Sequence, residues 1–432
     1  MIRRRLALAA IRVIVALVFA ELLSLTVYYY QTGHLFYLFR KTYETLPGTG
    51  RQPLTVEGLH PYFGPTHRPG HPFDIPPALR RSGAAPARLA TNNFGFVSAY
   101  DYPFPKTDPR QFVVGLFGGS VGVWFCQVGA PQLAAELKGD PFFRDRDIVP
   151  LCFSHEGYKQ PQQLLLLSYF LSIGQTFDLV VNIDGFNEVA LGSMNAEQGA
   201  DISMPSPPHL RPLVDLVNAS ALTPEKLRSL AAIGAYKDRL NTLAVWLRDN
   251  DLASVNLVLE QLYKITSARY HAERMTFSQL PPAPTDASLI QVTAPVRARD
   301  AEAVFDDIAA QWAHASTLMH QLLAPRNVPY VHVLQPNQYF TSRRFTEQEA
   351  RVALSDASPF KAGAARGYPA LLRHATALRE TTHFLDATHL FDDEPAAVYI
   401  DDCCHYTLRG YDLLAELIGR AVLRSRGPWS TQ

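Results

Sequence analysis

Residues 112–122 read FVVGLFGGSVG, and this stretch decides the fold class. The apolar residues at its start are typical of a strand that is buried on both faces, and the glycines that follow end the strand. Four more segments read as strands, with helical patterns between them. The predicted strands are 147–153, 178–183, 328–334 and 383–387, and the clearest helical patterns cover 160–173 and 406–423. Strands that alternate with helices predict an α/β domain with a mostly parallel, five-stranded sheet and helices on both of its faces.

Polar residues stand at the points where the predicted strands end. Ser120 follows the first strand, Gly157 the second and Asn187 the third, while the segment 401–405 (DDCCH) follows the last. The carboxyl ends of parallel strands meet at one edge of a sheet, and function in such sheets sits at that edge. We therefore expect these residues to lie together in one site.

The set contains one group for each step of an acyl transfer. A serine hydroxyl is a weak nucleophile at neutral pH, so an imidazole must take its proton and a carboxylate must orient that imidazole. We assign these roles to Ser120, His405 and Asp402. The oxyanion that develops needs preorganised donors. The predicted oxyanion hole consists of the backbone N–H groups of Ser120 and Gly157 and the side-chain amide of Asn187.

Taken in order along the chain, these segments resemble the four sequence blocks of the SGNH (GDSL-like) hydrolase family. The nucleophile block is Phe117–Val121, the glycine block is Gly157, the Gly-x-Asn block is Gly185–Asn187 and the Asp-x-x-His block is Asp402–His405. The resemblance implies a three-layer α/β/α, flavodoxin-like domain with the site residues in the roles given above. Two features depart from the family pattern: Gly-Gly-Ser-Val replaces Gly-Asp-Ser, and the helical insertion at about 204–326 is longer than in compact members.

The same segments also fit three different roles. The pattern Gly118-x-Ser120-x-Gly122 matches the nucleophile elbow of α/β-hydrolases, although little sequence before residue 111 is left for the strands that precede the elbow in that fold. The glycines could instead bind a phosphate, but the segment lacks the Gly-Lys-Ser/Thr of a P-loop. His405 could have a packing role at the start of a helix that Asp402 caps.

The N-terminus has the composition of a membrane segment. Arg3, Arg4 and Arg5 precede an apolar run over 6–30 that contains only two charged residues, Arg12 and Glu21. From Val13 to Tyr30 the run has 18 residues and one charge, which is close to the length needed to cross the hydrocarbon core. The arginines favour a cytoplasmic N-terminus. We predict an anchor helix within 1–34 and the rest of the chain outside the cytoplasm. A cleaved signal peptide, with Ala20 near the cut, and an amphipathic helix on a partner protein are the alternatives.

The rest of the chain is predicted to form three parts. Residues 35–110 are rich in Pro, Gly and aromatic residues, which indicates an extended segment packed on the main domain. Residues 111–425 form the hydrolase-like domain with its insertion, and 426–432 form a short tail.

Composition excludes some partners and cofactors from the prediction. The 40 basic and 40 acidic residues balance, so nothing indicates a nucleic-acid partner. Cys126, Cys152, Cys403 and Cys404 do not have the spacing of a zinc site, and we expect no metal and no cofactor. The sequence leaves open whether any of these cysteines form disulfides.

These observations lead to two hypotheses on function. The first is a serine ester hydrolase or O-acyltransferase, held by one helix in the inner membrane with its domain in the periplasm. Its expected substrates are acyl groups, above all acetyl, on envelope carbohydrate, and other esters are alternatives. The second is a non-enzymatic scaffold with the same fold, which would serve a membrane-protein partner in a larger complex.

Overall fold

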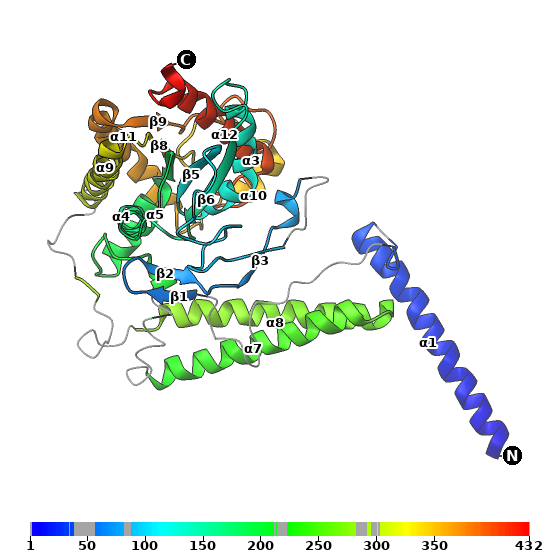
Figure 1. Cartoon of the computed structure of the whole chain (residues 1–432). Helices are drawn as coiled ribbons and strands as arrows, with labels where there is room; N and C mark the ends of the chain where they lie inside the picture. The colour runs from blue at the N-terminus through cyan, green and yellow to red at the C-terminus, as the bar shows by residue number, and fades with distance from the viewer. Residues whose placement is uncertain are drawn as a thin grey trace. The chain divides into compact units, whose positions relative to one another are not determined.

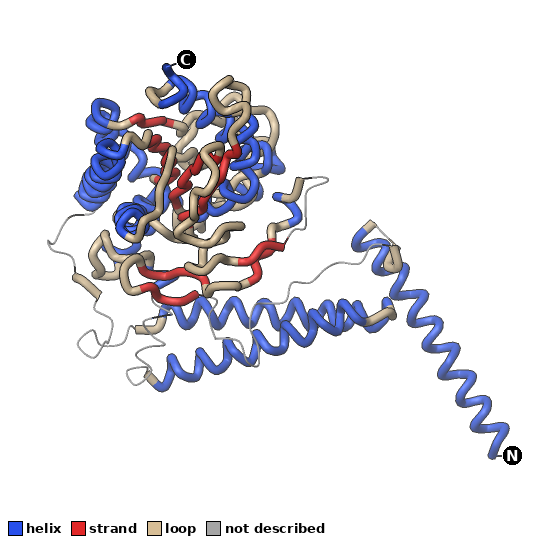
Figure 2. Tube along the Cα trace, viewed as in Figure 1, coloured by secondary structure: helices blue, strands red, loops and turns tan. Residues whose placement is uncertain are grey.

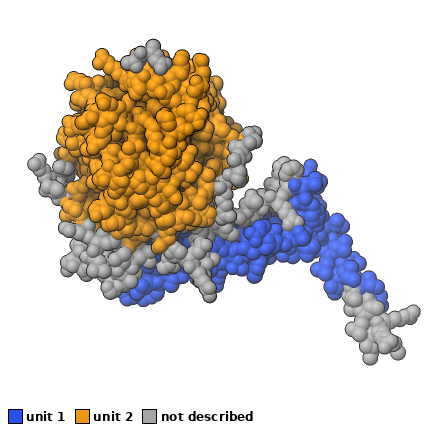
Figure 3. All heavy atoms as spheres, viewed as in Figure 1, with its two compact units in different colours: residues 1–56, 218–289 blue, residues 57–217, 290–432 orange. Residues whose placement is uncertain are grey.

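A computed structural model describes residues 2–33, 35–38, 57–81, 88–210, 213, 223–281, 292–294, 300 and 303–431. The chain divides into two compact units (Figure 3). The first combines Met1–Val56 with Asn218–Leu289, and the second combines Glu57–Val217 with Ile290–Gln432.

The second unit is built on a parallel sheet of five strands. The strands are β5 (Gln111–Gly118), β6 (Asp147–Ser154), β7 (Leu179–Asp184), β8 (Tyr330–Leu334) and β9 (His383–Asp386). They lie in the order β6-β5-β7-β8-β9, and every neighbouring pair is parallel. Their bounds agree with the predicted strands to within two residues. The expected α/β class and the five-stranded parallel sheet are thus confirmed (Figure 2).

Helices cover both faces of this sheet. Figure 1 shows α4, α5, α9 and α11 on one side and α3 and α12 on the other. Their bounds are Gln162–Ser172 (α4), Phe186–Glu197 (α5), Ala303–Leu323 (α9), Lys361–Thr381 (α11), Ala130–Leu137 (α3) and Leu408–Arg424 (α12). Alternate residues of β5 enter different apolar clusters, since Val114 and Leu116 belong to one and Val113 and Phe117 to the other. Burial on both faces explains why β5 is a continuous apolar run.

Strand β6 contains Pro150, which has no N–H to donate to a neighbouring strand. The strand lies at the edge of the sheet and pairs only with β5. An edge position tolerates proline because one side of the strand needs no partner.

The segment before the sheet forms two short antiparallel pairs. These are β1 (Glu57–His60) with β2 (Gly64–His67), and β3 (Pro72–Asp74) with β4 (Arg88–Ala90). The first pair is held on the sheet domain, because Tyr158 donates its hydroxyl to the carbonyl of Pro65 at 2.7 Å. Of the segment predicted at 35–110 to pack on the main domain, residues 39–56 and 82–87 lie outside the described residues.

One disulfide, between Cys126 and Cys152, joins the π-helical turn Phe125–Gly129 to β6. Cys403 and Cys404 are free. The structure therefore pairs two cysteines whose state the sequence left open.

The segment predicted as one helical insertion, 204–326, is divided between the units. Helices α7 (Pro224–Asp249) and α8 (Ala253–Gln279) belong to the first unit, while α9 belongs to the second. A buried stripe on α9 that includes Trp312 packs against the sheet, so α9 is part of the core domain. The segment 426–432, predicted as a short tail, packs on the domain through Trp429, which is 4% exposed and lies against Phe143.

Helix α1 (Ile2–Thr32) is the long apolar helix of the first unit. Its stretch Ile11–Tyr30 has a mean hydropathy of 2.0 and is almost wholly exposed in the chain. The stretch is long and apolar enough to cross a membrane.

Candidate active site

Ser120 and His405 meet at the carboxyl edge of the sheet. Ser120 follows β5 at the start of the short helix α2 (Ser120–Trp124), and its Oγ lies 2.7 Å from Nε2 of His405. Nδ1 of His405 lies 2.5 Å from Oδ2 of Asp401. A carboxylate can only accept, so Nδ1 carries the hydrogen and Nε2 is free to accept from the serine hydroxyl. The arrangement is that of a nucleophile, a general base and an orienting carboxylate.

A tight loop holds the base and the carboxylate together. The backbones of Tyr399 and Tyr406 form an antiparallel bridge, and the loop between them carries both residues. Oδ1 of Asp401 accepts from the backbone N–H groups of Cys403, Cys404 and His405 at 3.0–3.2 Å. One oxygen of Asp401 thus shapes the loop, and the other orients the imidazole.

Asp402, which the sequence assigned as the orienting carboxylate, does not have this role in the structure. The loop turns so that the residue four positions before His405, not three, reaches Nδ1. The backbone carbonyl of Asp402 is instead fixed by the hydroxyls of Tyr339 and Ser358 at 2.9 and 3.0 Å. The assignment of Asp402 was therefore wrong, and Asp401 takes its place.

Electrostatics support a charged Asp401. Burial alone would raise the pKa of this carboxyl group, but the hydrogen bond and charge of His405 and the backbone N–H donors outweigh it and lower the pKa. A carboxylate that stays ionised can stabilise the imidazolium that forms when His405 takes a proton.

Asn187 lies beside the nucleophile. It is the second residue of α5 and is 8% exposed. A Cβ added to Gly119 would lie 2.1 Å from its Nδ2, so only glycine fits before Ser120 with Asn187 in this position. Nδ2 also donates to the carbonyl of Tyr158 at 2.8 Å. The structure thus brings Asn187 to Ser120, as the sequence predicted.

Gly157 lies in the loop after β6 with a φ of 74°, a conformation that favours glycine. A Cβ there would lie 2.4 Å from the ring of His209 and 2.6 Å from the hydroxyl of Ser206. The next residue, Tyr158, accepts the hydrogen bond from Asn187, so the glycine loop lies against the start of α5. Donation from the Gly157 N–H to a substrate stays a prediction.

Glu188 joins the same two loops and was not assigned a role from the sequence. Its carboxylate accepts from the backbone N–H of Gln160 at 2.8 Å and from that of Gly185 at 2.7 Å. The side chain is buried, and burial together with the nearby charge of Asp184 raises its pKa. Its position directly after Asn187 was the signal, because a glutamate at the third position of a helix can cap that helix.

The two free cysteines directly precede His405. Their Sγ atoms lie 3.2 Å apart. Burial raises the pKa of the Cys404 thiol well above its ordinary value, and a hydrogen bond with Ser120 acts in the opposite direction. Cys404 is therefore a neutral thiol that packs beside the nucleophile.

Two groups of described residues combine ligand-type atoms within 4.8 Å of one another and could hold a metal ion. One is Cys403, Cys404 and His405, and the other is His67, His155 and Glu156. In the second group, Nε2 of His67 lies 3.0 Å from Oε2 of Glu156. Burial alone would raise the pKa of Glu156, but His67 and His155 lower it. A hydrogen bond between the His67 ring and the Glu156 carboxylate accounts for the closeness of these two side chains.

A second chain of serine, histidine and aspartate lies inside the domain. Oγ of Ser316 is 2.7 Å from Nδ1 of His332, whose Nε2 is 2.7 Å from Oδ1 of Asp184. The same oxygen accepts from the indole of Trp312 at 2.7 Å. Ser316 and His332 have no exposed surface, so a substrate cannot reach them. This network ties α9 to β7 and β8 and is structural.

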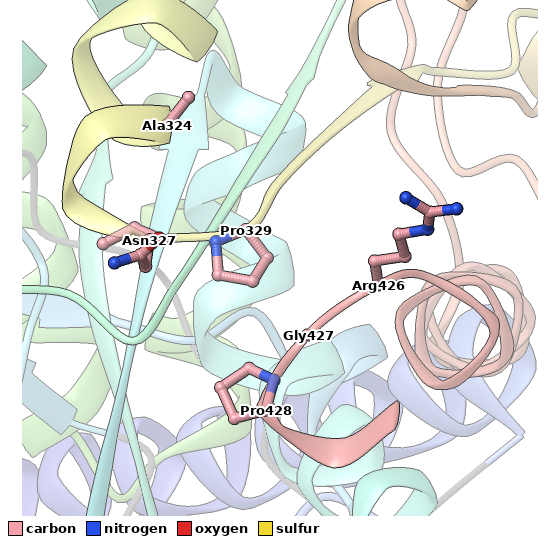
Figure 4. A pocket seen from close by; sticks show the side chains of 7 residues that line it. Ala324, Asn327, Pro329, Arg426, Gly427 and Pro428 are labelled. Carbon is pink, nitrogen blue, oxygen red and sulfur yellow. The ribbon is translucent and has the colours of Figure 1, made fainter. Parts of the chain in front are cut away.

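Two pockets differ in their relation to the site. One, of about 380 Å³, is lined by Gln338, Tyr339, Leu354, Ser355, Asp356 and Lys361. It adjoins the loop that carries Asp401 and His405, because Gln338 donates to the carbonyl of Asp401 at 3.0 Å. The other, of about 360 Å³ (Figure 4), includes Val328 and Pro329, which precede β8. It therefore lies at the amino edge of the parallel sheet, opposite Ser120.

The structure thus unites Ser120, His405 and Asn187 as expected, and the sequence missed Asp401 and Glu188. Neither the known protein-family models nor the curated proteins contain a match to this chain.

Proposed function

We propose that this protein is a serine ester hydrolase or O-acyltransferase of the SGNH type that works through an acyl-enzyme. The observation that carries the proposal is the hydrogen-bonded chain from Ser120 through His405 to Asp401. It lies at the carboxyl edge of a sheet whose strand order, 2-1-3-4-5 along the chain, is that of flavodoxin-like folds.

Acylation begins with attack of Ser120 Oγ on the ester carbonyl carbon while Nε2 of His405 takes the hydroxyl proton. Asp401 stabilises the imidazolium. His405 then gives the proton to the leaving alkoxide as the ester bond breaks, which leaves an acyl group on Ser120. Water or a sugar hydroxyl attacks this group with His405 again as base, and Ser120 recovers its proton.

The oxyanion is stabilised by donors that are already in place. Asn187 lies against Gly119, directly before Ser120, and its amide can donate to a substrate oxygen. The backbone N–H groups of Ser120 and Gly157 are the other donors in this proposal. Glu188 holds the loops that carry Asn187 and Gly157 in one arrangement.

The proposed substrates are acyl groups, above all acetyl, on envelope carbohydrate. Anchoring by α1 would place the domain at the membrane surface, and the Cys126–Cys152 disulfide suits an oxidising compartment. The pocket beside the catalytic loop offers Gln338, Tyr339 and the ion pair of Asp356 with Lys361. Such polar groups can bind sugar hydroxyls.

Hydrolysis of p-nitrophenyl acetate by the purified full-length protein tests the proposal. We expect Ser120→Ala to lower kcat/KM by about 100-fold or more. Ser316→Ala is the matched control, because Ser316 has the same kind of partners but is buried; its kcat/KM should stay within about threefold of wild type. Equal turnover by wild type and Ser120→Ala would contradict the proposal.

A further inference from the structure

A glutamate in the apolar helix α1 is bonded to the tip of the α7–α8 hairpin. Glu21 accepts from the backbone N–H groups of Ala253 and Ser254 at 2.6 and 3.0 Å and from the Ser254 hydroxyl at 2.6 Å. Ala253 and Ser254 begin α8. The carboxylate thus accepts hydrogen bonds from N–H groups that have no partner within α8. Its negative charge also interacts favourably with the positive, N-terminal end of the α8 helix dipole.

Apolar packing fixes the same junction. Tyr28 and Phe36 have their ring centroids 5.1 Å apart, and both are 1% exposed. They pack with Ala253, which is wholly buried, and with Leu25. Figure 1 shows the tip of the hairpin meeting α1 in the half of that helix that ends at Thr32. Glu21 therefore fixes the position along α1 at which the tip of the hairpin lies.

Helix α8 carries an exposed apolar stripe that starts at this junction. Its members recur at helical spacing and are 40–61% exposed: Val255, Val258, Leu262 and Ile265. Arg269, four residues further on the same face, ends the stripe. Near the tip, Trp246 is 56% and Leu252 51% exposed. A stripe of this kind beside polar faces is typical of a helix that lies in a membrane interface.

We propose that the tip of the α7–α8 hairpin and the stripe on α8 lie in the outer interface of the bilayer that α1 crosses. This inference rests on the membrane anchor of the proposed function. Lipid is the occupant because the stripe is continuous, through Glu21, with a helix whose exposed side chains are apolar. Trp246 is then an interfacial anchor, since its ring is apolar and its N–H can reach water.

The charges at the tip place it at the interface. Arg248 and Asp249 form an exposed ion pair at 2.8 Å, and such groups are costly in hydrocarbon. The water boundary then lies near Glu21. The apolar residues from Leu6 to Ala20 would form the span, about 22 Å long at 1.5 Å per residue, with Arg3, Arg4 and Arg5 at the inner interface. A span shorter than a core about 30 Å thick is accommodated by local thinning of the bilayer. This register is shifted toward the N-terminus relative to Ile11–Tyr30.

Quenching of tryptophan fluorescence by brominated lipids tests the inference. The full-length protein is reconstituted into phosphatidylcholine vesicles whose lipids carry bromine either near the headgroup or near the end of the acyl chain. The Trp246→Phe variant shows the emission of the remaining tryptophans alone, which are Trp124, Trp312 and Trp429 and all lie in the sheet unit. We expect roughly a twofold loss of the Trp246 emission with bromine near the headgroup and a smaller loss with deep bromine.

A pair of neighbouring variants gives the control. Leu262→Glu puts a charge on the stripe and should reduce the quenching of Trp246. Gln261→Glu adds the same charge one residue away, at an exposed position outside the stripe, and should leave quenching unchanged. Unquenched Trp246 in protein that floats with the vesicles would overturn the inference and indicate that water or a protein partner covers the hairpin. Protein that fails to float would overturn the anchor as well, whereas esterase turnover by the same sample tests the enzyme separately.

Discussion

At the scale of single residues, the choice between two adjacent carboxylates defines the site. Asp401 bonds to Nδ1 of His405, while Asp402 is held through its backbone carbonyl. We expect Asp401→Asn to lower kcat about 10⁴-fold, because an asparagine favours the wrong imidazole tautomer. Asp402→Asn is the matched control and should change kcat by less than about threefold. Steady-state hydrolysis of p-nitrophenyl acetate measures both, and the reverse order would restore Asp402 as the orienting residue.

Acid should remove the contribution of Asp401 to stability. The pKa of this carboxyl group is lowered in the folded protein. Its contribution is therefore present above the ordinary pKa of about 3.9 and is lost as pH falls through the lower folded-state value. We expect the difference in unfolding free energy between wild type and Asp401→Asn to be constant from about pH 7 to 5 and to shrink below about pH 4. Urea unfolding at several pH values measures it, and a difference that grows in acid would refute the assignment.

The sequence could not separate the two aspartates. Ser120, Asn187 and His405 were predictable because each follows a strand or precedes a helix that the pattern of apolar residues places. Asp401 and Asp402 lie in a loop, and no periodicity fixes which side chain faces inward. The bridge between Tyr399 and Tyr406 sets the path of the loop and so determines which of the two aspartates faces His405.

At the scale of elements, the loops of the proposed oxyanion hole depend on Glu188. In Glu188→Gln, an amide NH₂ group replaces one carboxylate oxygen. This group cannot accept the hydrogen bond that the oxygen accepts from a backbone N–H. We expect the free energy of unfolding to fall by about 1–3 kcal/mol and kcat to fall with it. Glu197→Gln, at the exposed end of the same helix, should change stability by less than about 0.5 kcal/mol. Denaturant unfolding of both variants is the measurement, and equal stabilities would contradict the role of Glu188.

The strands of the sheet were predictable because burial on both faces gives each one an apolar run. The position of α9 in the domain could not be predicted from the sequence. Its stripe of buried residues, which includes Trp312, has the same period whether the helix packs on the sheet or on another helix. The buried network of Asp184, His332 and Ser316 determines the position of α9, and its most distant members, Asp184 and His332, are 148 residues apart in the sequence.

At the scale of the whole molecule, the arginines in the first turns of α1 predict the topology of the chain. In a bacterial host, alkaline phosphatase fused after Gln432 should be active, and green fluorescent protein fused at the same position should not fluoresce. Replacing Arg3, Arg4 and Arg5 by glutamate is the control and should weaken this orientation. A fluorescent fusion without phosphatase activity would place the domain in the cytoplasm.

The division of the chain into units could be predicted only in part. The composition of 6–30 indicated an anchor, and the Pro-rich ends of the insertion indicated an added segment. That α7 and α8 join α1 rather than the sheet unit follows from contacts such as Glu21 with Ser254, 233 residues apart. No local pattern carries such long-range information.

Covalent labelling of the intact protein with a fluorophosphonate, followed by mass spectrometry of its peptides, tests the nucleophile itself. An activated serine reacts with this reagent, whereas an ordinary hydroxyl does not. We expect one adduct, on Ser120, that is lost in Ser120→Ala and strongly reduced in Asp401→Asn, with Ser316 unlabelled in every sample. A folded protein that carries no adduct on Ser120 would contradict the proposed chemistry and would favour a non-enzymatic scaffold.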